Sequence, residues 1–167
     1  MLNNEQVLIK LSQEFPDFIL NNHEEYGMLI IETNREAIRE IILYIRDEPS
    51  LKIDFFTTLC GLHYPENKSK ELGVMYQLHS FEHNYRIRFK VFFSIEDPTC
   101  PSIQDIYNAA NWQERQEYDF FGINFLNHPN LKRILNVDDM DYFPMRKEFK
   151  LEDATRTDKD DTFFGRA

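Results

Sequence analysis

The fold class of this 167-residue chain is decided by one stretch, Val74-Met75-Tyr76-Gln77-Leu78-His79-Ser80-Phe81 and, after a three-residue link, Tyr85-Arg86-Ile87-Arg88-Phe89-Lys90-Val91-Phe92-Phe93. In the second run apolar residues alternate with bases, and a period of two predicts a strand with one buried and one solvated face. The short link, residues 82–84, predicts a hairpin. Together with the Phe-, Thr- and Ile-rich run Ile53–Cys60, the stretch predicts a three-strand meander.

The residues before the meander predict two helices and a second hairpin. An apolar stripe at helical spacing runs from Val7 to Phe15 and stops at Pro16. Phe18–Leu20 and Met28–Ile31 are short β-rich runs, which we interpret as a hairpin whose loop is residues 21–27. A capping box at Thr33–Glu36 predicts that the second helix begins at Thr33. Its apolar stripe, before Pro49, consists of Ile38, Ile41, Ile42 and Ile45.

The residues after the meander favour helices. Pro98–Pro101 is expected to end the sheet, and Ser102 can cap a short helix whose inward residues are Ile103, Ile106 and Tyr107. A further helix is expected from about Asn108 to Phe121, with Gly122 as its C-cap. We therefore expect an α+β domain over residues 1–150 with a mixed or antiparallel sheet, and an extended polar tail over residues 151–167.

Composition and charge exclude several function classes. The chain carries 29 Asp and Glu against 19 Lys and Arg, a formal net charge of −10, which argues against nucleic acid and anionic lipid as general partners. Its apolar runs are too short to span a bilayer, and its N-terminus lacks the pattern of a signal or transit peptide. We expect an intracellular protein that reaches a membrane only through a partner.

No pattern in the sequence indicates a catalytic or metal site. The two cysteines, Cys60 and Cys100, form no C-x-x-C pair, which makes an iron–sulfur cluster or a four-ligand zinc site within this chain improbable. His79 and His83 are four residues apart but fall at a hairpin end, and His63 is expected in a loop. The acidic run Asp138–Asp141 lacks the glycine and the closing glutamate of an EF-hand. Sequences typical of nucleotide cradles are absent as well.

Residues 112–150 combine aromatic side chains with balanced charge. The segment holds 8 of the 24 aromatic residues, 7 acids and 6 bases. Ion pairs beside aromatic rings are typical of partly desolvated interfaces, although a solvent-exposed, salt-bridged helix end would give the same pattern. Arg115 and Asp119 are i,i+4 neighbours on the predicted helix. Physical reasoning leaves the two interpretations even.

This segment also resembles a known family. Three runs carry the resemblance, with their order and spacing: Trp112-Gln113-Glu114-Arg115-Gln116-Glu117-Tyr118-Asp119-Phe120-Phe121-Gly122-Ile123-Asn124-Phe125, then His128-Pro129-Asn130-Leu131-Lys132-Arg133-Ile134-Leu135, then Pro144-Met145-Arg146-Lys147-Glu148-Phe149. They are similar to the C subunit of NADH:quinone oxidoreductase, the respiratory complex I. Three positions depart from the family pattern: Gln116 replaces Glu, Asn127 replaces Gly and Met145 replaces Leu. Asn127 can adopt the left-handed backbone that Gly provides, and Leu to Met nearly conserves volume.

The resemblance implies a non-catalytic subunit of the peripheral arm of a proton-translocating oxidoreductase. It implies docking on the hydrogenase-like large subunit (the D subunit of that complex) and on cluster-bearing neighbours near the quinone site, on the cytoplasmic side of the bacterial inner membrane. Catalytic, cofactor-binding and metal-binding residues are not expected in this chain, because the resemblance places FMN and the iron–sulfur clusters in partner subunits. The residues expected to keep the interface or the fold are Glu114, Arg115, Tyr118, Asp119, His128, Arg133, Pro144, Arg146 and Lys147.

One pairing and two alternative functions remain open from the sequence. Arg115 is expected to pair with Asp119 or with a carboxylate of the partner. The equivalent subunit of a membrane-bound nickel–iron hydrogenase or of a ferredoxin-linked complex is one alternative function. A free-standing binding domain is the other.

Overall fold

A computed structural model describes residues 2–149, so the tail expected over residues 151–167 lies outside the described residues. In chain order the elements are α1 (Asn4–Glu14), β1 (Ile19–Glu25), β2 (Met28–Thr33), α2 (Ile38–Asp47), β3 (Phe55–His63), β4 (Leu72–Ser80), β5 (Tyr85–Phe93), β6 (Thr99–Pro101), α3 (Ala110–Phe121) and β7 (Asn124–Leu126). The α+β class is confirmed.

The main sheet has five strands in the order β1-β2-β5-β4-β3. The predicted meander is confirmed, since β3, β4 and β5 pair antiparallel in sequence. The first hairpin is also confirmed, but its strands extend through most of the expected loop to a two-residue turn. Tyr26 and Gly27 have φ of 51° and 76°, the positive values that a tight type I′ turn needs. The hairpin joins the meander through a parallel pairing of β2 with β5.

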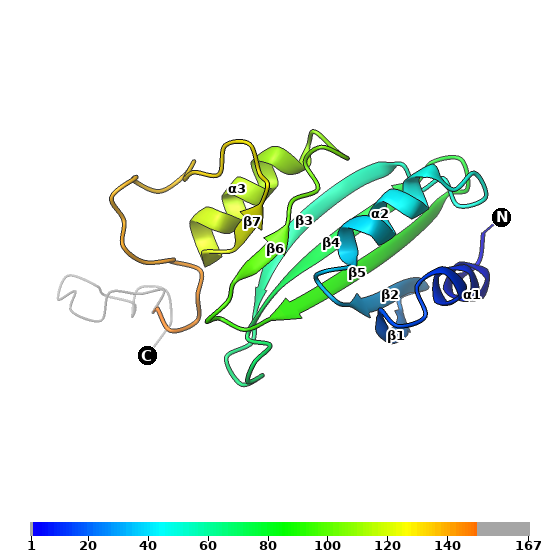
Figure 1. Cartoon of the computed structure of the whole chain (residues 1–167), viewed down its shortest axis with the longest axis horizontal. Helices are drawn as coiled ribbons and strands as arrows, with labels where there is room; N and C mark the ends of the chain where they lie inside the picture. Colours follow the sequence, from blue (N-terminus) through cyan, green and yellow to red (C-terminus); the bar gives the residue numbers. More distant parts are fainter. Residues whose placement is uncertain (1, 150–167) are drawn as a thin grey trace, which may run out of the picture.

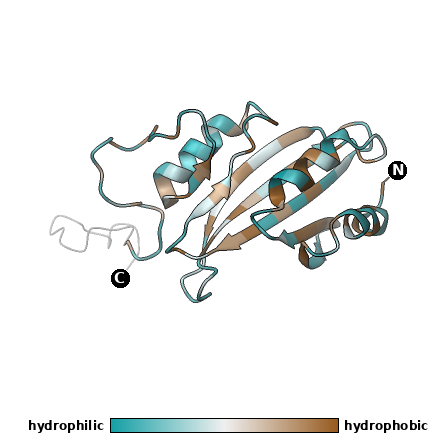
Figure 2. Cartoon of the chain, viewed as in Figure 1, coloured by the Kyte–Doolittle hydropathy of each residue, from teal (hydrophilic) through white to brown (hydrophobic). Residues whose placement is uncertain are grey.

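Helices α1 and α2 cover one face of this sheet (Figure 1). The expected stripe of α2 is fully buried, and Val7 and Leu11 of α1 join the same core cluster as the inward side chains of β4 and β5. Figure 2 shows apolar and polar bands alternating along β5, as its sequence predicts. Burying each such aliphatic side chain contributes about 1.5–3 kcal/mol, so this layer stabilises the fold.

The expected capping box is wrong. Thr33 belongs to β2, and its hydroxyl donates a hydrogen bond of 2.6 Å to the carbonyl oxygen of Phe18. Helix α2 begins only at Ile38, and its N-cap, Ala37, makes no side-chain hydrogen bond. The hydroxyl that the capping box would have used therefore binds the neighbouring chain segment at Phe18. Threonine is also a favourable strand residue, which explains why Thr33 extends β2.

The main sheet ends before Pro98–Pro101, as expected. The sequence did not predict that Thr99–Pro101 forms β6, which pairs in parallel with β7 in a small second sheet next to α3. Helix α3 ends as expected at Gly122, which has a left-handed φ of 75°. Among the described residues, no helix is long and apolar enough to cross a membrane.

Candidate functional site

Helix α3 lies along β3, the outer strand of the main sheet (Figure 1). An edge strand presents unpaired backbone N–H groups, and here side chains of α3 accept two of them. The amide oxygen of Gln113 accepts from the N–H of Leu59, and the carboxylate of Glu117 accepts from the N–H of Gly61 at 2.7 Å. Four residues of helix rise about 6 Å and two residues of strand about 6.6 Å, so the two spacings match.

Glu114, on a neighbouring side of α3, is buried against the loop after β6. Its carboxylate accepts from the hydroxyl of Ser102 at 2.6 Å and from the N–H of Ile103 at 2.7 Å. Burial raises the pKa of Glu114 to about 7, although both hydrogen bonds oppose the shift. The pKa of Glu117 is also raised to about 7 by burial. Glu114 therefore ties α3 to residues 102–103 through neutral donors only.

His128 lies next to Glu114, and its side chain is completely buried. Its Nδ1 accepts from the N–H of Asn130 at 3.1 Å, which requires the proton on Nε2. Nε2 then donates to the carbonyl oxygen of Asn111 at 3.2 Å, while it lies 4.0 Å from Glu114. Burial lowers the pKa of His128, so the neutral ring acts as a clip between α3 and the turn after β7.

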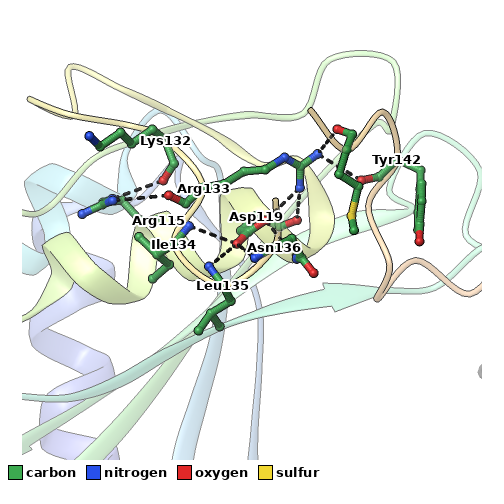
Figure 3. Close-up of polar contacts among 9 residues, drawn as sticks. Arg115, Asp119, Lys132, Arg133, Ile134, Leu135, Asn136 and Tyr142 are labelled. Atoms are coloured by element: carbon green, nitrogen blue, oxygen red, sulfur yellow. Dashed lines mark hydrogen bonds and ion pairs between the residues drawn. The ribbon is translucent and has the colours of Figure 1, made fainter. Parts of the chain in front are cut away.

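Asp119 is the centre of a polar cluster that holds the segment after β7 (Figure 3). We call residues 127–149 the signature loop. The carboxylate of Asp119 is fully buried and forms a 2.7 Å ion pair with Arg133. It also accepts hydrogen bonds from three successive backbone N–H groups, of Ile134, Leu135 and Asn136, and from the side-chain amide of Asn136.

These contacts decide the charge of Asp119. Burial by itself would raise the pKa of this carboxyl, but the hydrogen bonds from Asn136 and Leu135 and the guanidinium of Arg133 outweigh it. The pKa of Asp119 is held well below its usual range, and the group is a carboxylate at neutral pH. A buried charge with this many donors fixes the path of residues 133–136.

Arg133 continues the cluster along the loop. Its guanidinium donates to the carbonyl oxygens of Met140 and Tyr142 at 2.8 Å and 3.0 Å, in addition to Asp119 (Figure 3). It also lies 5.2 Å from the centroid of the Phe143 ring. One side chain thus connects α3 to residues 140–143 of the signature loop.

The ion pair expected between Arg115 and Asp119 does not form, since Asp119 binds Arg133. Arg115 is buried and stacks on Trp112, with 4.8 Å between its guanidinium carbon and the ring centroid. It donates to the carbonyl oxygens of Lys132 and Arg133. The alternative pairing of Arg115, with a carboxylate of a partner, stays a prediction.

The remaining residues of the predicted set secure the end of the loop. Tyr118 packs edge-on against Phe143, and Arg146 donates to the carbonyl oxygen of Phe121 at 2.7 Å. Pro144 is half-buried just before a backbone hydrogen bond from Met145 to Phe120. The backbone N–H of Lys147 donates to Nδ1 of His63 at 2.9 Å.

Several residues of the site were missed or misplaced by the sequence. His63, expected in a surface loop, is the buried last residue of β3, where it binds the signature loop. Gln113 and Ser102 were not predicted as binding partners of β3 and Glu114. For Gln113 the sequence offers one signal, its i,i+4 spacing from Glu117, which places the two acceptors on one face of the helix. Asn127 has the left-handed φ of 65° that was expected of it.

The signature loop exposes apolar side chains to solvent, while the polar contacts of Asp119 and Arg133 hold its backbone. Leu135 and Val137 are 61% and 62% exposed, and Met145 is 49% exposed, although the backbone between them is held by Asp119 and Arg133. Exposed apolar side chains on an ordered loop are typical of an interaction surface. Within residues 2–149, no group of three or more His, Cys, Asp or Glu side chains is placed to hold a metal ion.

Comparisons with solved structures agree with this fold. The chain is similar to a trypsin-resistant fragment of Nqo5, with 27% identity and a TM-score of 0.65 over 76% of this chain and 98% of the fragment. A chain of an archaeal membrane-bound sulfane sulfur reductase gives a TM-score of 0.72 over 88% of this chain. At 20% identity, the second likeness concerns the fold alone.

Comparisons of sequence are more specific. The chain is 41% identical over 125 residues to the NADH-quinone oxidoreductase C subunit of Streptomyces coelicolor, and the match spans 75% of this chain but only half of that relative. It is 37% identical to the corresponding C subunit of Roseiflexus castenholzii over 90% of this chain and 86% of the relative. The family model described as the 30 kDa subunit of respiratory-chain NADH dehydrogenase matches residues 31–155, which include the buried carboxylates of α3 and the signature loop. This chain belongs to that family.

Proposed function

We propose that this chain is a non-catalytic subunit of the peripheral arm of a proton-translocating NADH:quinone oxidoreductase. In this proposal the signature loop docks on the hydrogenase-like large subunit, near the quinone site, on the cytoplasmic face of the bacterial inner membrane. FMN and the iron–sulfur clusters belong to partner subunits. The chain contributes to the enzyme by assembling with the other subunits, and its buried polar residues fix the conformation of the signature loop.

The proposal rests on a contrast within residues 112–149 between buried charged side chains and exposed apolar side chains. The charged residues of α3 are buried and satisfied inside the chain: Glu114, Arg115, Glu117 and Asp119. The three carboxylates, Glu114, Glu117 and Asp119, therefore do not themselves form the contact surface. The loop that they hold exposes Leu135, Val137 and Met145 among charged residues. Apolar side chains surrounded by a polar rim are what a partner subunit covers.

The test is co-purification from membranes solubilised in a mild detergent. A tagged chain is expected to bring down a hydrogenase-like large subunit and cluster-bearing subunits. The double variant Leu135→Asp/Val137→Asp is expected to keep its thermal unfolding midpoint, because both side chains are mostly exposed, and to lose the large subunit. The matched control is Ile9→Asp, an exposed apolar residue of α1 that is 49% exposed and far from the loop in sequence.

Two results would contradict the proposal. One is recovery of a large subunit with the nickel-ligating cysteine pairs of a hydrogenase, which would favour the related hydrogenase complex. The other is a stable monomer in membranes and cytosol alike, with no co-purifying subunit.

A further inference from the structure

The two faces of the main sheet differ in what covers them. One face packs against α1 and α2, and its side chains form the core cluster. The strand register places the alternate side chains in three rows on the other face: Phe55, His79 and Arg86; Thr58, Gln77 and Arg88; Cys60, Met75 and Lys90. These nine residues are absent from the core cluster, and among the described helices only α3 reaches them, at the β3 edge, where the hydroxyl of Thr58 donates to the amide oxygen of Gln113 at 3.2 Å. We call this surface the helix-free face, because α1 and α2 cover the other side of the sheet.

The helix-free face carries unpaired positive charge. Arg86, Arg88 and Lys90 follow one another along β5 at intervals of about 7 Å. Within residues 2–149, none of these three bases has a carboxylate within ion-pair distance, and Arg88 is bound only by Gln77 at 3.0 Å. Glu32, the neighbour of Lys90 on β2, is occupied by Lys70 at 3.0 Å. A row of free bases is unusual on a chain whose net charge is −10.

An exposed aromatic pair lies at one end of this row. Phe81 and Phe55 are 65% and 44% exposed, and their ring centroids are 4.8 Å apart in an edge-on arrangement. His79 lies against Phe81 at 4.7 Å, and its buried Nε2 has no hydrogen-bond partner among the described residues. Aromatic rings and arginines are the side chains most enriched at the centres of protein interfaces.

We propose that the helix-free face is a second docking surface, and that its occupant is an acidic surface of a neighbouring protein subunit. Charge complementarity selects this occupant, because Asp and Glu side chains would pair with Arg86, Arg88 and Lys90. Three bases on an acidic chain are too few to hold a nucleic acid, whose binding depends on many phosphate contacts. The exposed Phe55 and Phe81 add contact area that a protein partner can bury. The inference rests on the proposed function, since it requires a multi-subunit complex.

The first experiment compares two double variants in the tagged, assembled complex. Arg86→Glu/Lys90→Glu reverses the row without touching Arg88, the one base that binds within the sheet. Arg86→Lys/Lys90→Arg keeps the charge at the same positions. We expect the reversal to lower recovery of the chain in the complex about tenfold, since opposed like charges strongly disfavour association, and the charge-keeping variant to assemble as wild type. The charge-keeping variant is expected to unfold as wild type. The isolated full-length reversal is expected to remain folded with a slightly lower unfolding midpoint, because Lys90→Glu faces Glu32 across the strand pair.

The second experiment needs no substitution. Cys60 is partly buried on the helix-free face and keeps some exposure, whereas Cys100, the other cysteine of the chain, is fully buried. A maleimide reagent therefore reports on this face. We expect labelling of Cys60 to be at least about tenfold slower in the complex than in the isolated chain, since an interface core excludes solvent.

The outcomes separate this inference from the proposed function. If the wild-type chain brings down no large subunit, the proposed function fails and this inference fails with it. If the wild-type chain assembles but the charge reversal assembles equally well, or Cys60 labels at equal rates, the helix-free face is free and this inference alone is overturned. Binding of the isolated chain to anionic lipid vesicles that is lost in the charge reversal would also overturn it, because the occupant would then be a lipid surface.

Discussion

At the scale of single residues, two carboxylates of α3 are buried alike and charged differently. Asp119 has a guanidinium and several N–H donors around it, and its pKa is held well below its usual range. Glu114 has one hydroxyl and one N–H donor, and burial raises its pKa to about 7. The contrast shows that the partners, and not burial alone, decide which buried acid is ionised.

The first prediction concerns Asp119→Asn. The substitution removes the charge that Arg133 pairs with, and a stranded buried charge costs roughly 2–5 kcal/mol. The free energy of unfolding in urea at pH 7 should fall by that amount. The folded-state pKa of Asp119 is depressed, so its contribution is present above the unfolded pKa, about 3.9, and is lost as the pH falls below it. The difference between variant and wild type should therefore shrink as the pH falls below about 3.9. A difference as large at pH 2 as at pH 7 would contradict the assignment.

The second prediction concerns Glu114→Gln, whose amide oxygen can still accept from the N–H of Ile103 while its amide NH2 donates to the hydroxyl of Ser102. The raised pKa means that the folded state holds a proton that the unfolded state releases between about pH 4.3 and 7, so wild-type stability falls with rising pH across that window. The variant carries no such group. Relative to wild type it should gain about 2–4 kcal/mol between pH 4 and pH 8.

Urea unfolding at both pH values measures this gain. Glu66→Gln, at an exposed position in the loop after β3, serves as the matched control and should leave the pH dependence unchanged. An equal difference between wild type and Glu114→Gln at pH 4 and pH 8 would show that Glu114 does not hold its proton in the folded state.

At the scale of elements, α3 replaces a sixth strand at the edge of the sheet. Gln113 and Glu117 of α3 accept hydrogen bonds from the N–H groups of Leu59 and Gly61. The ring of Phe121, also in α3, lies close to Gly61. A Cβ at position 61 would come within 2.5 Å of the Phe121 ring and 2.7 Å of the Glu117 carboxylate. A glycine is needed here because helix and strand approach closely, and its φ is not in the left-handed region.

The third prediction follows from this close approach. Gly61→Ala should destabilise the chain by about 1–3 kcal/mol, because overpacking forces α3 away from β3 and weakens both hydrogen bonds. The double variant Gly61→Ala/Phe121→Leu should recover part of the loss, since leucine removes the ring that the new methyl group meets. Thermal unfolding of the two variants and of Phe121→Leu alone completes the cycle. Simple additivity of the two single changes would contradict the contact.

Elements were predictable from the sequence where one period dominated. The alternation in residues 85–93 and the stripe from Ile38 to Ile45 each match a single structure, and both are confirmed. The capping box at Thr33 failed because a hydroxyl can serve a helix end or a neighbouring strand, and the local sequence does not show which partner is near. Strand β6 was not predicted for a related reason. Its three residues are too few to show a period, and their partner strand β7 lies more than twenty residues later.

At the scale of the whole molecule, the sequence located the site better than it explained it. The segment 112–149 stands out by its aromatic and charge content, and it does form one connected assembly around α3. The ion pairs within this segment were not predictable. The i,i+4 spacing suggested that Asp119 pairs with Arg115, whereas Asp119 pairs with Arg133, fourteen residues away on the signature loop. Long-range pairing depends on the fold, which spacing along one helix does not describe.

The central claim is that buried charges of α3 hold the signature loop as the docking surface for the hydrogenase-like large subunit. The most direct test places a photo-activated cross-linking residue at Val137, which is 62% exposed and whose side chain takes no part in the Asp119 cluster. After irradiation of the purified complex, we predict a cross-link to the hydrogenase-like large subunit that disappears in the Asp119→Asn background. A complex that assembles and yields no cross-link to that subunit from position 137 would contradict the account.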